Sequence, residues 1–208
     1  MNEISPPTKR ESTDDRRAAI AMAARALIIE KGFEGLRTRD IADRVGINIA
    51  TLHYHVPSRQ ALIELVAQTI KAQFKEQGKR RPRINLSPLV RLRMEFEDFR
   101  ENLIEHPDLA IIFSEMMDKA RRDVNVEDVV APLHTFWTGQ FEHILAAGIT
   151  DGSFRPDLHQ RAGALLISGA LSDYWRRSPK DIPTYDRLAL ELERAVINPA
   201  FSNKEAQK

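Results

Sequence analysis

Apolar residues recur every three or four positions along most of this chain, the spacing that puts side chains on one face of an α-helix. Ser12 and Asp15 form the pattern of a capping box, and Gly32 is placed to end the helix that follows. The apolar face of this first segment comprises Ile20, Ala23, Ala24, Leu27 and Ile28. Alternating β-branched runs, which are typical of strands, are absent. We therefore predict an all-α fold of about nine helices.

Between Thr38 and Arg59 the sequence TRDIADRVGINIATLHYHVPSR predicts two short helices separated by a sharp turn. Thr38 is expected to cap the first helix through its hydroxyl group. Gly46 supplies the left-handed backbone conformation that ends this helix. The inward face of the first helix consists of Ile41, Ala42 and Val45. This arrangement is typical of a helix-turn-helix.

The second helix of the pair has one inward position, Leu52, and is stopped by Pro57. Ile47 is expected to fill the space between the two helices, and Asn48 to cap the second. The outer side of the second helix presents Ile49, Ala50, His53 and Tyr54. A helix of this size fits the major groove of DNA, where its side chains meet base edges and phosphates. The pattern therefore predicts binding to double-stranded DNA.

Residues 16–70 resemble the DNA-binding domain of the TetR family of bacterial transcriptional regulators. The matching positions are Thr38, Ile41, Ala42, Val45, Gly46, Ile47, Thr51, Leu52, His53, Tyr54, His55, Val56, Ser58, Arg59 and Leu62. The chain departs from the family pattern at His53, where tyrosine is usual, at Ala50, where glycine is frequent, and at Arg59, where lysine is usual. Arg59 keeps the charge for a phosphate, whereas His53 keeps a hydrogen-bonding ring of shorter reach.

The resemblance implies a set of DNA-binding residues on and around the second helix. These are Thr38, Arg39, Asn48, Ile49, Ala50, Thr51, His53, Tyr54, His55 and Arg59. Ile49 is open to two interpretations, because its side chain suits either contact with a thymine methyl group or packing within the protein.

The chain is expected to divide into three parts. Residues 1–13 form a disordered arm, residues 14–78 form the DNA-binding domain with a connecting helix that starts at Ser58, and residues 84–200 form an effector-binding and dimerisation domain. The segment GKRRPRINLSP, from Gly78 to Pro88, combines a helix breaker, basic residues and prolines and is taken as the boundary. Helical patterns then fall at residues 87–105, 107–122, 126–147, 158–177 and 184–196, with a turn at residues 148–156.

Two apolar stripes near the C-terminus are predicted to form a dimer interface. Their members are Ala162, Leu165, Leu166 and Gly169 on one helix, and Leu188, Leu192 and Ala195 on the next. The resemblance implies that both helices pair across a two-fold axis into a four-helix bundle, which would space two recognition helices by roughly 34 Å for a palindromic operator. The alternative for each residue is an intramolecular core.

Aromatic and methionine residues are concentrated in the C-terminal part. They are Phe96, Phe99, Phe113, Met116, Met117, Phe136, Trp137, Phe141 and Trp175. The hypothesis, which depends mainly on the resemblance, is an apolar pocket for a small organic effector. The competing interpretation is a plain hydrophobic core. The family pattern implies a repressor that leaves its operator when the effector binds.

Composition and charge are consistent with this function. Residues 1–83 carry 16 Lys and Arg against 10 Asp and Glu, a net +6, and the remainder carries 15 against 20, a net −5, which together give the +1 of the whole chain. A basic N-terminal part favours a polyanionic partner. No cysteine and no apolar run of roughly 18 residues is present, so we expect a cytoplasmic protein without disulfides or a membrane span.

No catalytic, cofactor or metal-binding pattern is found in the sequence. There is no cysteine nucleophile, no G-x-S-x-G turn and no phosphate-binding glycine loop, and the six histidines are scattered. We predict that the protein is not an enzyme. The alternative kept beside the repressor is a DNA-binding or protein-interaction protein without a small-molecule effector.

Overall fold

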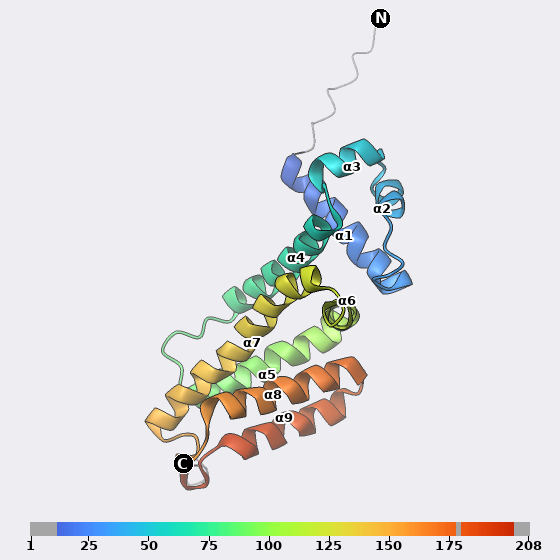
Figure 1. Ribbon diagram of the computed structural model, residues 1–208. Helices are drawn as coiled ribbons and strands as arrows, with labels where there is room; N and C mark the ends of the chain where they lie inside the picture. The colour runs from blue at the N-terminus through green and yellow to red at the C-terminus, as the bar shows by residue number, and fades with distance from the viewer. Residues whose placement is uncertain (1–11, 178–179, 202–208) are drawn as a thin grey trace, which may run out of the picture. The chain divides into compact units, whose positions relative to one another are not determined.

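The computed structural model describes residues 12–177 and 180–201, and their secondary structure is helical (Figure 1). The helices are α1 (Thr13–Lys31), α2 (Thr38–Val45), α3 (Ile49–His55), α4 (Arg59–Arg80), α5 (Pro88–Glu105), α6 (Pro107–Ala120), α7 (Val124–Asp151), α8 (Gln160–Arg177) and α9 (Ile182–Val196). A helical turn follows at residues 199–201. The all-α prediction is confirmed. The described residues include one isolated antiparallel bridge, between Phe154 and Ile197.

The described chain divides into two compact units, one ending at Ile70 and the other starting at Lys71. The division falls inside α4, so this helix belongs to both units. None of the described helices is long and apolar enough to span a membrane. The proposed arm lies at residues 1–13; its first eleven residues are outside the described part, and Thr13 already belongs to α1.

Helix α1 begins and ends where the sequence predicts. The Ser12 hydroxyl accepts from the Asp15 backbone N–H at 3.0 Å, and the Asp15 carboxylate accepts from the Ser12 backbone N–H at 3.3 Å, which completes the capping box. At the other end the helix stops at Gly32, whose φ of +70° is easily adopted only without a side chain.

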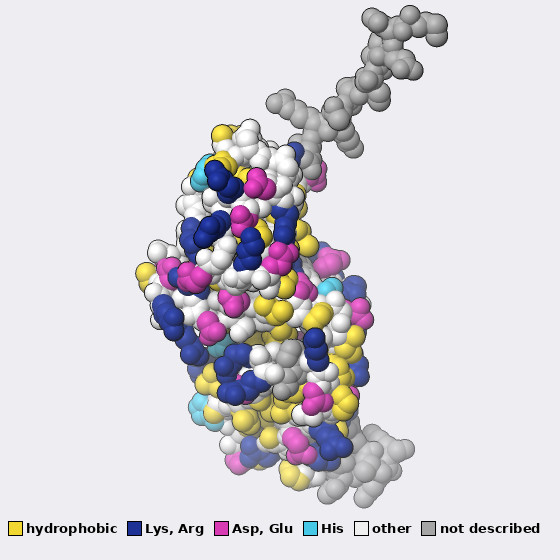
Figure 2. Space-filling model, turned by 90° about the vertical axis from the view of Figure 1, so that its right-hand side faces the viewer, with side chains coloured by type: hydrophobic (Ala, Val, Ile, Leu, Met, Phe, Trp, Pro, Cys, Tyr) yellow, Lys and Arg dark blue, Asp and Glu magenta, His cyan; other side chains and the backbone are white. Residues whose placement is uncertain are grey.

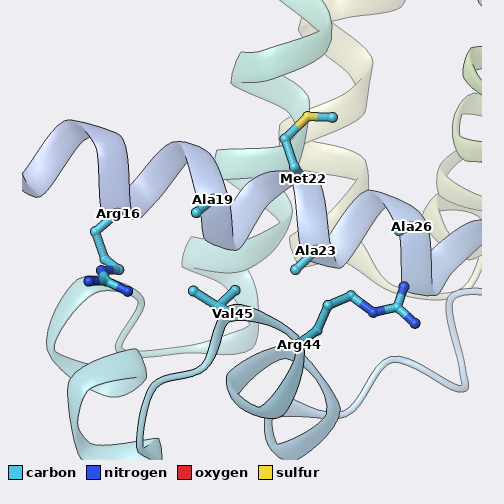
Figure 3. Close-up of a pocket in the computed structure, with 7 residues that line it drawn as sticks. All are labelled: Arg16, Ala19, Met22, Ala23, Ala26, Arg44 and Val45. Carbon is cyan, nitrogen blue, oxygen red and sulfur yellow. The ribbon is translucent and has the colours of Figure 1, made fainter. Parts of the chain in front are cut away.

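Helix α2 packs on α1 through small residues. Figure 3 shows Val45 directed toward the α1 side that carries Ala19 and Ala23. Two ion pairs at the end of α1 add to this contact. Lys31 Nζ lies 2.6 Å from the Asp40 carboxylate, and Glu30 accepts two hydrogen bonds of 2.8 Å from the Arg44 guanidinium.

The segment expected to separate two domains is instead bound to α5 inside the C-terminal unit. Helix α4 continues through Gly78 to Arg80, so the expected helix stop at Gly78 is wrong. The buried Gln77 side chain explains the continuation, because it donates to the Asp98 carbonyl oxygen at 3.0 Å and accepts from the Asn102 amide at 2.9 Å.

The arginines that follow Gly78 are paired with acidic side chains of α5. Arg80 contacts Glu101 at 2.7 Å, Arg81 contacts Asp98 at 2.5 Å, and Arg83 pairs with Asp98 as well. The net charge of +6 counted for residues 1–83 includes these arginines. Because carboxylates of α5 neutralise them, the excess of positive charge left for the helix-turn-helix is smaller than the count suggests.

The C-terminal unit is held together by close contacts between helices and the turn after α7. A Cβ added at Gly148 of α7 would lie only 2.0 Å from Phe154 Cδ2, so any side chain at Gly148 requires Phe154 to shift. The Phe154 N–H donates to the Gly148 carbonyl at 2.9 Å. The buried Tyr185 hydroxyl of α9 donates to the Phe96 carbonyl of α5 at 2.6 Å, and burial raises the pKa of Tyr185.

Candidate nucleic-acid interface and C-terminal cleft

The turn between α2 and α3 has the predicted geometry. Gly46 ends α2 in the left-handed conformation, with φ 73° and ψ 34°, and its N–H donates to the carbonyls of Ala42 and Asp43. Asn48 Oδ1 then accepts from the Thr51 backbone N–H at 2.7 Å and caps α3. Because both contacts are local, the angle between the two helices is set by the residues of the turn itself.

The predicted cap at Thr38 is wrong. Arg37 occupies the N-cap position in an extended conformation and makes no capping hydrogen bond, while Thr38 is the first residue of α2. Asp40 in the first turn of α2 places a negative charge near the positive end of the helix dipole. A hydrogen bond from Lys31 lowers the pKa of this carboxyl group, which keeps it ionised.

Helix α3 has one buried side and one exposed side, as predicted. Leu52 is 2% exposed, whereas Tyr54 is 81% and Ile49 40% exposed. Ala50 and His53 are exposed beside them. Figure 2 shows Lys and Arg side chains and a histidine on the visible face of the N-terminal unit, with Asp and Glu side chains among them. The side of α3 that was predicted to contact DNA is therefore at the surface.

Arg59 is engaged within the N-terminal unit. Its guanidinium donates to the Phe33 carbonyl oxygen at 3.1 Å and lies 5.3 Å from the centroid of the Phe33 ring. The family resemblance implied a phosphate contact for Arg59. In the structure the same group connects the start of α4 to the loop after α1.

His55 is half-buried, whereas His53 is exposed. Its Nδ1 atom is buried without a hydrogen-bond partner among the described residues, and its ring packs edge-on against Tyr54 at 5.1 Å. Arg17 of α1 donates to the His55 carbonyl oxygen at 2.7 Å. This hydrogen bond satisfies one of the carbonyl groups that lack a partner within the helix at the end of α3. Sequence reasoning missed Arg17, because a contact across 38 residues has no local signal.

The other predicted DNA-binding residues lie at the surface near α3. Thr38, Arg39 and Asn48 are exposed and Thr51 is half-buried. The side-chain Oδ1 of Asn48 accepts the capping hydrogen bond of α3, which leaves the side-chain NH₂ group for another contact.

Phe99 is the centre of a packed aromatic cluster in the C-terminal unit. Phe99 stacks on Trp137 at 6.1 Å and on Tyr185 at 5.5 Å, and meets Trp175 edge-on at 5.3 Å. Trp137 in turn meets Phe141 at 5.8 Å. Most of the predicted pocket residues therefore fill the core, as the competing interpretation had it.

Phe136 does not line a pocket, contrary to the prediction. Its side chain is 60% exposed, so it belongs neither to a pocket nor to the core. The helical spacing of aromatic residues did not identify its face, because Phe136 and Trp137 are adjacent and point in different directions along α7.

A cleft of about 290 Å³ lies between α6, α7 and α8. Its lining residues are Ala110, Phe113, Ser114, Met117, Asp118, Arg121, His134, Gly169, Ser172, Asp173, Trp175 and Arg176. Three of the nine predicted pocket residues, Phe113, Met117 and Trp175, are among them. Phe96, Met116 and Phe141 are instead fully or almost fully buried outside this lining.

The predicted dimer residues divide between surface and core. Ala162, Leu165, Leu166 and Gly169 form an exposed face of α8, with Leu165 48% and Leu166 52% exposed. Leu192 of α9 is only 5% exposed, so its assignment to an interface is wrong and it belongs to the intramolecular core. Leu188 and Ala195 are half-buried.

Comparisons with known proteins agree with this geometry. Residues 20–66 match the model of the family described as bacterial regulatory proteins, tetR family. The match covers the later part of α1, all of α2 and α3, and the first part of α4. The HTH-type transcriptional repressor KstR2 of Mycolicibacterium smegmatis is 27% identical over 155 residues, which cover 74% of this chain and 75% of that protein.

Solved structures share the fold over both units. A TetR transcription regulator from Haloarcula marismortui superimposes with a TM-score of 0.77 at 18% identity and covers 89% of this chain and 100% of its own. FadR from Bacillus subtilis, in complex with stearoyl-CoA, superimposes with a TM-score of 0.72 at 17% identity. The match covers 85% of this chain and 95% of that chain.

Proposed function

Because this chain belongs to the TetR family of bacterial regulatory proteins, we propose that it is a cytoplasmic, homodimeric transcriptional repressor. It binds a palindromic DNA operator and leaves it when a small organic effector occupies the C-terminal unit. The observation that carries the proposal is the division of α3, where Leu52 is buried while Ile49, His53 and Tyr54 are exposed beside a capped turn.

Sequence-specific binding follows from the chemistry of that exposed side. Tyr54 and His53 offer hydrogen-bonding groups to base edges, and Ile49 and Ala50 offer apolar contact to thymine methyl groups. Thr38, Arg39, Asn48 and Thr51 are assigned to phosphates that orient the helix. Since α3 has only seven residues, one copy reaches few base pairs, and two copies on a two-fold axis read a palindrome.

The exposed apolar face of α8 supports the dimer. Leu165 and Leu166 are about half exposed, and Gly169 has no atom within 4 Å of an added Cβ, so a helix of a second copy can approach closely. An effector then acts through a difference in affinity for two dimer shapes. A coupling free energy of about 1–3 kcal/mol changes operator affinity roughly 5–150-fold.

Selection of bound duplexes from a random pool tests the proposal. We expect an inverted repeat whose half-sites are spaced by about one helical turn, and protection of that repeat in a footprint. Binding that follows only salt and duplex length, without any enriched sequence, would refute sequence-specific repression. An enriched palindrome whose binding no small molecule reverses would instead favour the regulator without an effector.

A further inference from the structure

Helix α3 has no permanent positive charge of its own for the phosphates of DNA. Its residues, Ile49–His55, include neither lysine nor arginine. The arginines nearest to it in the sequence already have partners within the N-terminal unit. Arg44 donates two hydrogen bonds of 2.8 Å to Glu30, and Arg59 donates to the Phe33 carbonyl oxygen. Since phosphate contacts supply a large share of the affinity of proteins for DNA, a cation beside α3 has to come from another part of the fold.

Arg17 of α1 brings such a charge to α3. Figure 1 shows the first turns of α1 beside α3, and Arg17 Nη1 donates to the His55 carbonyl oxygen at 2.7 Å. The Arg17 side chain is half-buried and forms no ion pair within the described part of the chain. The nearest acidic residues in the sequence are Asp14 and Asp15, and the Asp15 carboxylate accepts from Ser12 instead. A guanidinium has five N–H donors, so the bond to His55 leaves the other donors and the positive charge for a further contact.

The position of this guanidinium suits a phosphate of DNA. The carbonyl groups at the C-terminal end of α3 form the negative end of the helix dipole, which repels phosphates, and the charge of Arg17 offsets this repulsion. A helix of seven residues is about 10 Å long and the major groove is about 12 Å wide, so a group at the end of α3 is close to the phosphates that border the groove. The hydrogen bond to His55 also orders the guanidinium before DNA binds, which reduces the entropy lost on binding.

On the basis of the DNA binding in the proposed function, we propose that Arg17 is a phosphate-binding residue that fastens the C-terminal end of α3 to the DNA backbone. One N–H group stays on the His55 carbonyl oxygen, and the remaining N–H groups donate to a phosphate, the anion that the planar guanidinium fits best together with carboxylates. A phosphate contact carries no sequence information, so Arg17 orients α3 while the exposed side chains of α3 read the bases.

The salt dependence of DNA binding by the full-length protein tests this role. Arg17→Gln removes the charge and keeps an N–H donor for the His55 carbonyl oxygen, and circular dichroism without DNA checks its folding. We expect the slope of log affinity against log salt concentration to become less negative by about 0.9 per subunit, or about 1.8 for a dimer. At low salt, affinity should fall at least about tenfold for operator and scrambled duplexes alike. An unchanged slope would overturn the proposal.

Two further variants separate the charge of Arg17 from its geometry and from the net charge of the unit. Arg17→Lys keeps the charge and loses the planar group, so the slope should stay as in the wild-type protein. A slope reduced as much as in Arg17→Gln would mean that Arg17 acts only by holding α3, which overturns the phosphate contact. Lys31→Gln is the matched control, because it removes an exposed charge from the same helix about 21 Å away along the axis and should leave the slope unchanged. An equal reduction in this control would assign the effect to net charge and overturn the proposal as well.

Failure of this role is distinguishable from failure of the proposed function. Phosphate contacts do not depend on sequence, so the slopes can be measured on any duplex. A reduced slope in Arg17→Gln without any enriched palindrome would support the phosphate contact and refute sequence-specific repression. An enriched palindrome with equal slopes for the wild-type and Arg17→Gln proteins would support the repressor and overturn the role of Arg17.

Discussion

The Arg59 guanidinium lies 5.3 Å from the centroid of the Phe33 ring and donates to the Phe33 carbonyl oxygen at 3.1 Å. This pair connects the start of α4 to the loop between α1 and α2. Since the family pattern places a basic residue here, the contact gives that residue a structural task in addition to any phosphate contact.

We predict that Arg59→Ala lowers the free energy of unfolding of the N-terminal unit by about 1–2 kcal/mol, from the loss of one hydrogen bond and one cation–π contact. Urea unfolding without DNA, followed by circular dichroism, measures the change. Arg59→Lys is the control, because it keeps the charge and loses the planar group. An unchanged unfolding curve together with weakened DNA binding would assign Arg59 to phosphate alone.

Two residues of α3 that are two positions apart should behave in opposite ways. Tyr54→Ala removes an 81% exposed side chain, and we expect stability to change by less than about 0.5 kcal/mol while operator binding weakens by about 1–3 kcal/mol. Leu52→Ala removes a side chain that is 2% exposed and should destabilise the unit by about 2–5 kcal/mol.

Gel-shift titration and thermal unfolding on both variants separate these effects. Binding of the Tyr54 variant should also be compared on scrambled duplexes. If the Tyr54 variant loses equal affinity for operator and scrambled DNA, the residue does not contribute to base recognition.

The sequence predicted the helix-turn-helix well because its determinants are local. Gly46 and Asn48 act on residues within four positions, and both were identified. Thr38 failed as a cap because the preceding Arg37 takes the extended conformation instead. Gly78 failed as a helix stop because the Gln77 side chain, bound to α5, holds the helix beyond it.

The C-terminal site was less predictable because contacts between helices, and not local determinants, decide which side chains are buried. Phe136 and Trp137 have the same aromatic character, and only the packing of α7 against its neighbours makes one exposed and the other half-buried. Leu192 shared a plausible stripe with Leu188, yet it points into the core. The cleft also depends on polar residues such as Ser172, which no apolar pattern reveals.

The glycines of α7 provide a matched stability test. Gly148→Ala would put a Cβ 2.0 Å from Phe154 Cδ2, and we expect a destabilisation of about 1–3 kcal/mol from overpacking. Gly139 has no atom within 4 Å of an added Cβ, so Gly139→Ala should stabilise the helix by about 0.5–1 kcal/mol. Urea unfolding followed by tryptophan fluorescence reports both. A stable Gly148→Ala protein would mean that Phe154 moves aside.

Acid should loosen the contact between α1 and α2. Hydrogen bonds from Arg44 and Lys31 lower the pKa values of Glu30 and Asp40, respectively, below their unfolded values. The stabilisation by each pair is therefore complete above the unfolded pKa and is lost as the pH falls through the folded pKa.

Glu30→Gln isolates one pair. We expect the variant to show faster amide hydrogen exchange than the wild-type protein in α1 and α2 at neutral pH, and the difference to disappear in strong acid. Both carboxylates are exposed, so added salt should also reduce the difference. A difference that persists unchanged in acid would exclude the ion pair as its cause.

The dimer face can be tested by placing a charge at each of three leucines, two of them exposed and one buried. Leu165→Glu places a carboxylate on the exposed face of α8 that is proposed to meet a second copy, and we expect monomers in sedimentation equilibrium with helical content retained. Operator affinity should fall as well, since a monomer carries one recognition helix.

Two further variants are controls for this result. Leu190→Glu, on a 54% exposed residue of α9 outside the proposed stripe, should leave the dimer intact. Leu192→Glu should unfold the C-terminal unit, because this side chain is 5% exposed. A Leu165→Glu protein that sediments as a dimer would move the interface away from α8.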